Sequence, residues 1–296
     1  MHILNSSLAI AFSFWLDDEN KLYSSQWLSA KRPIVVLDSG VGGLTLSRQL
    51  ELLLPEASIL YVVDNEWFPY GSKSGAEISQ RVQHLIDQLY TQIRPLAIVV
   101  ACNTASVAMK DYGLDSCVQH CFLITPPLEE AVEISDQKNI VLLATPGTVK
   151  SRYIRRAMAI TRNRANIWPI AAQPLVALSE ARLAGQVASF ASFTKLVDDH
   201  LTTKQRFSID TVILGCTHFP HVIKDLEGIF PSVQNWLDPA KKVALRVAST
   251  VKKKHASISQ PLKAVIFTSK QDIIGYRKVF SKNGFCTDIK TLTANF

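Results

Sequence analysis

The sequence predicts an α/β protein made of two similar α/β domains with mainly parallel sheets. Short apolar runs of strand length alternate with stretches of helical periodicity along most of the 296 residues. The strand-like runs are continuously apolar, which is typical of parallel strands covered by helices on both faces. Two distant segments, "IVVACNTAS" and "VILGCTHFP", share a strand–Cys–Thr–helix arrangement, which indicates two related halves.

The first half alternates strand and helix in regular order. Apolar runs that end beside polar or glycine residues predict strands at 33–40, 57–64 and 95–101. Helical spacing of apolar residues predicts the helices between and after them, at 44–54, 75–92 and 106–113. Pro55 is expected to stop the first of these helices.

The second half repeats this scheme. Strands are predicted at 139–145, 166–170, 210–215 and 262–268, with a weak last strand at 285–292. Helices are predicted at 147–159, 174–184, 187–201, 220–230 and 271–284. Thr148 is the expected N-cap of the helix at 147–159. Pro220 is expected in the first turn of its helix, and Gly284 is expected to close the last one.

The composition, 47% hydrophobic and 19% charged, is that of a globular protein. The apolar run at 8–16 has no preceding Lys or Arg, is followed by acidic residues, and is too short to span a bilayer. Residues 1–32 are therefore predicted to form an N-terminal extension, and no membrane partner is expected. Five cysteines without framework spacing favour reduced thiols and a cytoplasmic location.

The net charge of +7 would attract an anionic substrate. The basic residues are scattered, except for two short lysine runs at 241–242 and 252–254 that are expected to form a solvated helix face. No aromatic residues are interleaved with them and no nucleic-acid module is recognisable. Nucleic acid is therefore not expected as a partner.

Polar residues gather where the predicted strands end. These groups are Asp38-Ser39, Asp64, Cys102-Asn103-Thr104 and Cys216-Thr217-His218. Ligands of open α/β sheets bind beyond the carboxyl ends of the strands. We therefore expect the four groups to contribute to one site.

Each of the two central cysteines stands at a predicted helix N-terminus, where a lowered thiol pKa is expected. Two buried structural thiols are one interpretation. Metal binding is another, but only His218 stands near Cys216, and "CVQHC" at 117–121 lacks a fourth ligand and is expected to be structural. A third interpretation is a pair of bases that inverts an acidic carbon, one taking the proton as a thiolate and the other delivering one. The "DSG", "CNT" and "CTH" segments would then stabilise the anionic intermediate.

Five segments together resemble glutamate racemases, in family order and at family spacing. They are "VVLDSGVGGLTL", "DNEWFPYGSKS", "IVVACNTAS", "LLATPGTVKSRY" and "VILGCTHFPHV". The resemblance runs from about residue 33 to near the C-terminus and implies an isomerase that interconverts L- and D-glutamate for peptidoglycan synthesis, with no cofactor. It also implies an active site between two domains, 33–126 plus 237–296 and 127–236.

The resemblance further implies roles for single residues. Cys102, assisted by Asp38, would act on D-glutamate, and Cys216, assisted by His218, would act on L-glutamate. Glu180, just before "ARLAG", matches a family glutamate. The residues expected to contact substrate are Asp38, Ser39, Pro69, Tyr70, Gly71, Cys102, Asn103, Thr104, Thr145, Thr148, Thr217 and His218. No metal is implied, whereas a homodimer and regulation by a cell-wall precursor are expected from relatives.

An aspartate racemase and a binding protein are the alternatives to this interpretation. Aspartate racemases have a histidine where Ser106 stands and a glutamate where His218 stands, so glutamate is favoured as the substrate. The segment "LDPAKK" at 237–242 departs from the "DSG" usual in the family near this point. A binding protein with the same cleft remains an alternative, although binding alone needs no thiol on either side of a carbon.

The first motif allows two further interpretations. Its glycines, Gly40, Gly42 and Gly43, would suit a phosphate cradle but fit neither the dinucleotide fingerprint nor the P-loop. The "VLDSG" segment is similar to the loops of aspartic proteases. That fold is all-β and needs two such loops, whereas this chain has one loop and alternates strands with helices.

Overall fold

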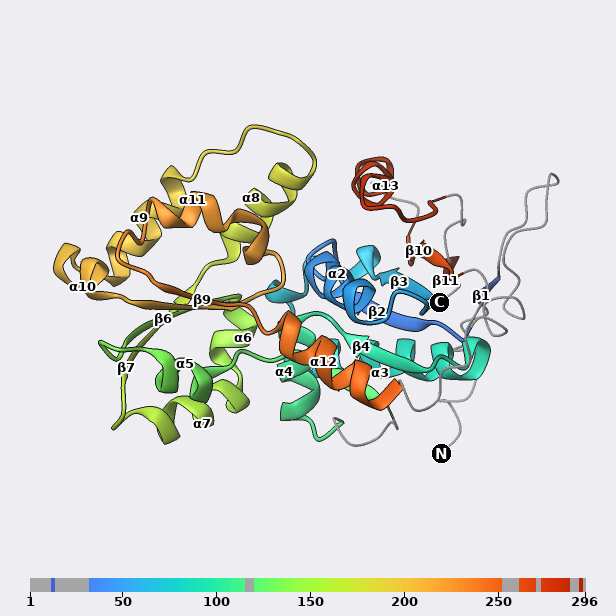
Figure 1. Cartoon of the computed structure of the whole chain (residues 1–296), viewed down its shortest axis with the longest axis horizontal. Helices are drawn as coiled ribbons and strands as arrows, with labels where there is room; N and C mark the ends of the chain where they lie inside the picture. Colours follow the sequence, from blue (N-terminus) through green and yellow to red (C-terminus); the bar gives the residue numbers. More distant parts are fainter. Residues whose placement is uncertain are drawn as a thin grey trace, which may run out of the picture.

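The computed structural model describes residues 32–114, 120–251, 261–269 and 273–287, together with two-residue strands at 12–13 and 293–294. Two parallel sheets, of five and four strands, lie side by side and each carries its own helices (Figure 1). We call the five-stranded sheet with its helices the first lobe and the four-stranded sheet with its helices the second lobe. The predicted α/β class with two mainly parallel sheets is confirmed.

The first sheet has strand β2 (Ile34–Asp38) at its centre. Its order is β10-β3-β2-β4-β5, with β3 at Ile59–Val63, β4 at Ala97–Val100, β5 at Cys121–Leu123 and β10 at Lys263–Phe267. All four pairings are parallel. β2, β3 and β4 are buried at every position, as expected for strands covered on both faces.

Alternate residues of these strands face two separate cores. Val36 and Tyr61 pack with helices α2 (Leu44–Leu53), α12 (Ala240–Val251) and α13 (Ile273–Lys282). Val35 and Leu37 pack with α3 (Gly75–Ile93) and α4 (Asn103–Asp111) on the other face. The helices on both faces fix the directions in which the strand ends point.

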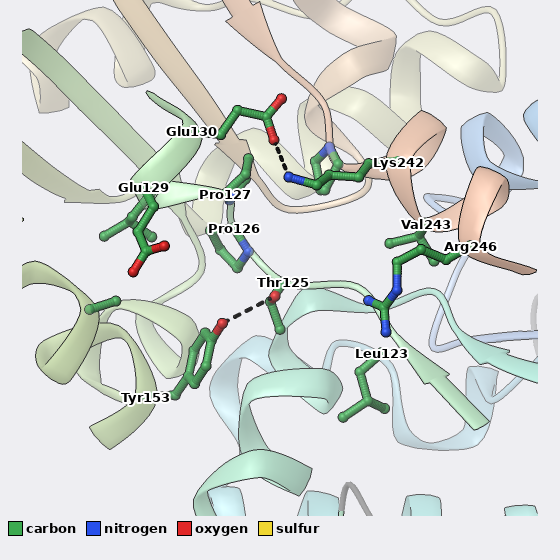
Figure 2. A pocket seen from close by; sticks show the side chains of 13 residues that line it. Leu123, Thr125, Pro126, Pro127, Glu129, Glu130, Tyr153, Lys242, Val243 and Arg246 are labelled. Carbon is green, nitrogen blue, oxygen red and sulfur yellow. Dashed lines mark hydrogen bonds and ion pairs between the residues drawn. The ribbon is translucent and has the colours of Figure 1, made fainter. Parts of the chain in front are cut away.

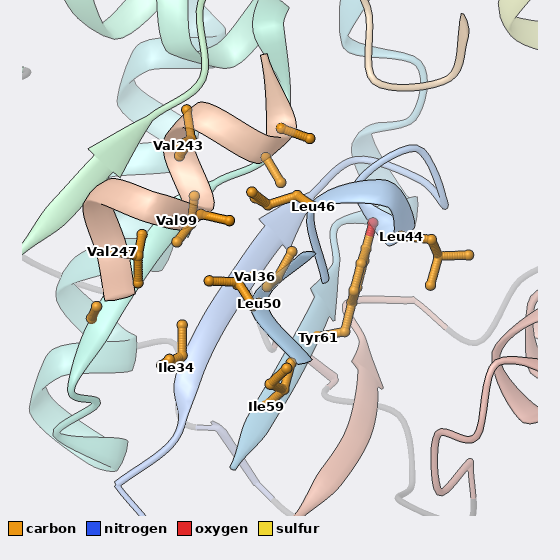
Figure 3. Packing of buried hydrophobic residues seen from close by; sticks show 14 of the residues in the cluster. Ile34, Val36, Leu44, Leu46, Leu50, Ile59, Tyr61, Val99, Val243 and Val247 are labelled. Carbon is orange, nitrogen blue, oxygen red and sulfur yellow. The ribbon is translucent and has the colours of Figure 1, made fainter. Parts of the chain in front are cut away.

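Figure 3 shows the core between the first sheet and the helices α2 and α12. Leu46 and Leu50 of α2 meet Val243 and Val247 of α12 above the strands, and all four side chains are buried. Each such side chain contributes about 1.5–3 kcal/mol by leaving water. This packing joins the C-terminal part of the chain to the first lobe.

The second sheet has the order β7-β6-β8-β9, again with every pairing parallel. Its strands are β6 (Asn139–Ala144), β7 (Asn166–Ala171), β8 (Thr211–Gly215) and β9 (Asn235–Leu237). Helices α5 (Leu128–Ile134) and α7 (Arg152–Thr161) cover one face. The other face packs against α8 (Gln173–Leu183), α9 (Ala191–His200) and α11 (Ile223–Glu227). A short helix, α10 (Thr203–Ser208), precedes β8.

The expected helix at 147–159 is wrong as a single element, and Thr148 is not its N-cap. The segment forms two helices, α6 (Pro146–Lys150) and α7, which begin at separate caps. Thr145 Oγ1 accepts the N–H of Thr148 at 3.3 Å, and Ser151 Oγ accepts the N–H of Ile154 at 3.1 Å. The Ser151 hydroxyl offers the backbone an N-cap, so a second helix starts there.

Other elements differ in extent from the expectation. The segment 220–230 begins as a 3₁₀ turn, η3 (Phe219–Val222), and continues as the five-residue α11. The helix expected from residue 187 begins at Ala191. In the weak strand expected at 285–292, Cys286 forms an isolated parallel bridge with Ala264, and residues 288–292 lie outside the described part.

The expected N-terminal extension, residues 1–32, lies outside the described part apart from Arg32 and the strand β1 (Phe12–Ser13). β1 pairs antiparallel with β11 (Thr293–Ala294). The lysine run at 252–254 is also outside, whereas Lys241 and Lys242 are exposed on α12 as expected. Among the helices that the structure describes, none is long and apolar enough to cross a bilayer.

The chain crosses between the lobes twice, after β5 and before α12. A cavity of about 300 Å³ lies between the two crossings (Figure 2). Across it, Lys242 Nζ lies 2.7 Å from Glu130 Oε2, and the hydroxyls of Tyr153 and Thr125 are 3.4 Å apart. In the "LDPAKK" departure, Asp238 Oδ1 accepts the N–H of Ala240 at 2.8 Å, so this aspartate forms an Asx turn directly before α12. The predicted domain boundaries near these crossings stay a prediction.

Candidate active site

The carboxyl ends of the two sheets face each other across the lobes. In each sheet the strand order reverses between two central strands, β2 and β4 in the first lobe and β6 and β8 in the second. Such switch points open a crevice for a ligand. Hydrogen bonds that join Asp38 to Thr217, and Thr104 to Thr145, link these strand ends across the lobes. The two crevices therefore form one site.

Cys102 follows β4 and occupies the N-cap position of α4. Its side chain is 7% exposed. Burial raises the thiol pKa above its usual value of 9, and the charges of Asp38 and Cys216 raise it further. The backbone N–H groups of Ala105 and Thr104 act in the opposite direction but do not outweigh burial. The expected lowering of the thiol pKa is therefore wrong for Cys102, which holds its proton at neutral pH.

Asp38 ends β2, beside Cys102, and is fully buried. Burial raises its pKa from 3.8 to about 6, although the charge of His218 and hydrogen bonds from Gly40, Thr217 and Ser39 oppose this. The Thr217 hydroxyl donates to Asp38 Oδ2 at 3.1 Å, and the N–H of Gly40 reaches Oδ1 at 3.4 Å. A carboxyl with this pKa exchanges protons readily near neutral pH.

Cys216 follows β8 and has a different neighbour, the imidazole of His218. Cys216 Sγ lies 3.8 Å from His218 Nδ1, and His218 Nε2 lies 3.0 Å from Glu180 Oε1 on α8. Burial alone would lower the pKa of His218, but its hydrogen bonds with Cys216 and Glu180 outweigh burial and raise the pKa well above 6.5. The raised pKa favours the imidazolium form of His218 at neutral pH, and the ring is held between Cys216 Sγ and the Glu180 side chain.

The glycines of the first motif bring the lobes into contact. A Cβ at Gly42 would lie 2.5 Å from Thr217 Oγ1 and 2.7 Å from His218 Nδ1. A Cβ at Gly40 would lie 2.6 Å from Glu180 Oε1. Only a loop without side chains fits against the second lobe here. This contact explains the glycines without a phosphate, so the cradle alternative has no support.

Three threonines form a second contact between the lobes. Thr104 Oγ1 lies 2.7 Å from Thr145 Oγ1, which lies 3.0 Å from Thr148 Oγ1. Asn103, beside them, is buried, and its amide oxygen and nitrogen have no hydrogen-bond partner among the described residues. Buried amides are nearly always hydrogen bonded. Asn103 is thus suited to bind a polar ligand.

The loop that contains Pro69, Tyr70 and Gly71 also lies beside the site. Tyr70 and Gly71 belong to a 3₁₀ turn, η2 (Tyr70–Ser72), and are buried. A Cβ at Gly71 would lie 2.9 Å from Thr145 Cβ and would overlap Gln173 Oε1. Gln173 is a polar residue at this point that the sequence motifs did not indicate.

Unlike the other strand-end groups, Asp64 is held by hydrogen bonds within the first lobe. Its carboxylate accepts hydrogen bonds from Arg81 Nε at 3.0 Å, from the Tyr70 hydroxyl at 2.6 Å and from the Thr268 hydroxyl at 2.7 Å. These bonds hold the 69–71 loop in place. The expectation that Asp64 joins the site directly is therefore wrong, because Asp64 supports the loop beside the site. The sequence did not indicate its partner Arg81.

The remaining predicted residues lie as follows. Ser39 is buried directly after Asp38, and Ser106 hydrogen-bonds to Val100 and Ile124 inside the first lobe. Within the described ranges no group of three or more His, Cys, Asp or Glu residues is arranged to hold a metal ion. Cys117 of the "CVQHC" segment lies outside those ranges.

Comparisons with known proteins agree with this geometry. A family model described as Asp/Glu/Hydantoin racemase matches residues 45–244. The glutamate racemase of Brucella canis is 31% identical over 223 residues, which cover 75% of this chain and 80% of that protein. The glutamate racemase of Brucella anthropi is 32% identical over 228 residues, 77% of this chain and 82% of that protein.

Solved structures give the same result. The glutamate racemase of Escherichia coli, in complex with L-glutamate and the activator UDP-MurNAc-Ala, has a TM-score of 0.77 and 30% identity, covering 86% of this chain and 96% of that chain. The glutamate racemase isoform RacE1 of Bacillus anthracis has a TM-score of 0.70 and 26% identity, covering 88% and 97%. The resemblance predicted from the five motifs is confirmed. The chain belongs to the Asp/Glu/hydantoin racemase family of isomerases, and the four similar proteins described above are glutamate racemases.

Proposed function

We propose that this protein racemises glutamate with two cysteines and no cofactor, and that it supplies D-glutamate for peptidoglycan synthesis. One observation carries the proposal. Two buried cysteines follow the central strands β4 and β8 at the facing switch points of two parallel sheets, close enough for their charges to interact. Inversion of a carbon that bears an acidic proton needs a base on one face and an acid on the other.

The proposed mechanism gives the two cysteines different roles. Cys102 is a protonated thiol, because burial raises its pKa. Cys216 Sγ lies 3.8 Å from His218 Nδ1, and in the proposed step its thiolate removes the Cα proton of L-glutamate. The Cα–H bond breaks toward Cys216, and Cys102 then delivers its proton to the opposite face. This leaves Cys216 as a thiol and Cys102 as a thiolate, ready for D-glutamate.

The surrounding polar groups suit a substrate with two carboxylates and an ammonium group. The unpartnered amide of Asn103 and the hydroxyls of Thr104, Thr145 and Thr148 would bind these groups. In the reverse direction, Asp38 would assist the thiolate of Cys102 as it accepts the Cα proton of D-glutamate. Fixed donors of this kind stabilise the charge that develops on the substrate as the Cα proton leaves.

The proposal is tested by circular dichroism of L-glutamate with the purified protein, without any added cofactor. We expect the signal to decay to zero, and we expect D-glutamate to give the mirror-image decay. L-aspartate under the same conditions is expected to change far more slowly. Equal decay of aspartate would assign a different substrate, and an unchanging signal for both amino acids would contradict the racemase proposal.

We also propose regulation by a cell-wall precursor, because the similar Escherichia coli structure contains the activator UDP-MurNAc-Ala. Racemisation is then expected to be faster in the presence of that compound. An unchanged rate over a concentration series, with glutamate near KM, would contradict this part alone.

A homodimer and a cytoplasmic location complete the proposal. Cys102, Cys121 and Cys216 are free thiols, which supports a reducing compartment. The oligomeric state is tested by sedimentation velocity at micromolar concentration, where a single monomeric species would contradict the dimer.

A further inference from the structure

A chain of hydrogen bonds leads from Cys216 to the C-terminal helix α13. Cys216 Sγ lies 3.8 Å from His218 Nδ1, and His218 Nε2 lies 3.0 Å from Glu180 Oε1. The second oxygen of the same carboxylate, Glu180 Oε2, accepts a hydrogen bond from the Tyr276 hydroxyl at 3.4 Å. Tyr276 is thus one residue beyond the group that orients His218.

The carboxylate of Glu180 has a hydrogen-bond partner on each oxygen, His218 on Oε1 and Tyr276 on Oε2. Its side chain is 21% exposed, whereas the side chain of His218 is 4% exposed. The backbone at Gly40 passes close to Oε1 on one side, where a Cβ would come within 2.6 Å. A donor on Oε2 keeps the plane of the carboxylate turned so that Oε1 faces the imidazole.

The hydroxyl of Tyr276 is itself held in place. Its ring packs on Phe267 of β10, with ring centroids 6.0 Å apart and planes inclined by 33°. The ring also packs against the core between the first sheet and α2. Tyr276 therefore belongs to the first lobe, while Glu180, His218 and Cys216 belong to the second.

The end of α8 also contacts the first lobe. Leu183, three residues beyond Glu180, packs against the core of the first lobe. One turn of α8 thus anchors to the first lobe through Leu183 and through the hydrogen bond of Glu180. In Figure 1, α8 lies on the side of the second lobe that faces the first, and α13 lies at the upper edge of the first lobe.

We propose that Tyr276 is a positioning residue for the Cys216 half of the reaction. It fixes the carboxylate of Glu180, which fixes the ring of His218 against the thiol of Cys216. Its position in the other lobe makes this alignment depend on the closed arrangement of the two lobes. This inference rests on the racemase function proposed above.

The test is Tyr276→Phe, which removes the hydroxyl and keeps the ring on Phe267. We expect kcat/KM to fall about five-fold, the effect of one ordinary hydrogen bond. Enantiomers have equal free energies, so kcat/KM must fall equally in both directions. The distinguishing readout is the primary isotope effect measured with glutamate deuterated at Cα.

The isotope effect reports which proton transfer limits the rate. In Tyr276→Phe the effect with deuterated L-glutamate should rise, since removal of its proton by Cys216 becomes slower. The effect with deuterated D-glutamate should stay the same or fall, since its proton is removed by Cys102. A general loss of structure would not produce this asymmetry. Equal changes for both enantiomers, or no change in rate, would overturn the inference.

Tyr153→Phe is a matched control, because it removes a hydroxyl contact of the same length, 3.4 Å to Thr125, at the crossing between the lobes. It should change neither isotope effect. A double-mutant cycle with Glu180→Ala, which removes both carboxylate oxygens, completes the test. If Tyr276 acts through Glu180, its substitution should have no further effect in the Glu180→Ala background, and a full five-fold loss there would overturn the inference. Failure of the unsubstituted protein to racemise glutamate would instead count against the proposed function.

Discussion

The two halves of the site present the same local motif in opposite electrostatic settings. Each places a cysteine after a central parallel strand and before a helical turn, followed closely by a threonine. In the first lobe the neighbour of the cysteine is a buried carboxyl, Asp38, and the thiol pKa is raised. In the second lobe the neighbour is the imidazolium of His218, backed by Glu180.

The difference shows that the motif supplies position, whereas burial and the neighbouring groups make the two settings unlike. Burial is the largest cause of the raised pKa of the Cys102 thiol, and the charge of Asp38 adds to it, so this thiol keeps its proton. Cys216 Sγ instead lies 3.8 Å from the ring of His218. A protein that must offer an acid on one face of a carbon and a base on the other can obtain both from two copies of one motif.

Substitution of either cysteine is the strongest way to break the comparison. Cys102→Ser and Cys216→Ser should each lower kcat/KM by roughly 10³–10⁴-fold, since each removes one of the two proton-transfer groups. The measurement is racemisation of both enantiomers, with far-UV circular dichroism as the control for folding. A folded variant that keeps most of its activity would contradict the assignment of that cysteine.

A larger residue at Gly42, in the glycine-rich loop after Asp38, should displace His218. Gly42→Ala would place a Cβ 2.7 Å from His218 Nδ1 and 2.9 Å from the His218 backbone nitrogen. The resulting shift should lower kcat/KM by about 10²-fold, as misplacement by about 1 Å does elsewhere. Gly228→Ala is the matched control, because its Cβ would meet only the Asp225 carbonyl, at 3.7 Å. Similar losses in both variants would show that steric fit at Gly42 is not the cause.

Ionisation of the buried carboxyl of Asp38 at high pH should lower the free energy of unfolding. Its pKa is raised from 3.8 to about 6 in the folded protein, so its stabilising contribution is complete below pH 3.8 and is lost as the pH rises through about 6. Asp38→Asn should therefore stabilise the fold by about 3 kcal/mol above pH 7, and this gain should shrink as the pH falls towards 4.

Urea unfolding at pH 5 and pH 8 measures this gain. The exposed Asp136→Asn serves as the control and should change the free energy of unfolding by less than about 0.5 kcal/mol at both values. A gain for Asp38→Asn that is the same at pH 5 and pH 8 would show that burial of the charge is not its source.

The smallest effect is expected at the crossing between the lobes. Lys242 and Glu130 form an ion pair of 2.7 Å, but their side chains are 66% and 36% exposed. Lys242→Met should lower the free energy of unfolding by less than about 1 kcal/mol. It should also leave the isotope effect of each enantiomer unchanged, because this contact lies beside neither cysteine. An asymmetric change would link the crossing to one half of the site.

The sequence predicted the sheets because their strands are buried on both faces and read as continuous apolar runs, as "ILYVV" and "TVILG" do. It also predicted which strand ends carry polar groups. It missed short elements such as β5 and α5, which are only three and seven residues long and therefore give a weak periodic signal. It predicted one helix at 147–159 where the structure has two, because the cap at Ser151 depends on a hydroxyl that competes locally with helix continuation.

The site shows the same limit. Cys102, Cys216 and their immediate neighbours could be found because each stands within a contiguous motif. Glu180 was indicated only by the resemblance to the family, whereas Arg81, Gln173 and Tyr276 join the site or its support only through tertiary contacts. The raised pKa of the Cys102 thiol was also hidden, because burial depends on packing of the whole lobe, whereas the helix N-terminus is visible in the sequence.

The central claim is that two different groups, on opposite faces, remove and return the proton. The most direct test follows the first turnovers of L-glutamate in deuterated water and analyses both enantiomers for label at Cα. We expect every new molecule of D-glutamate to carry solvent deuterium, while recovered L-glutamate keeps its original proton, and the reverse when the reaction starts from D-glutamate. Retention of the original proton in the product, or equal labelling of both enantiomers from the start, would contradict the two-base account.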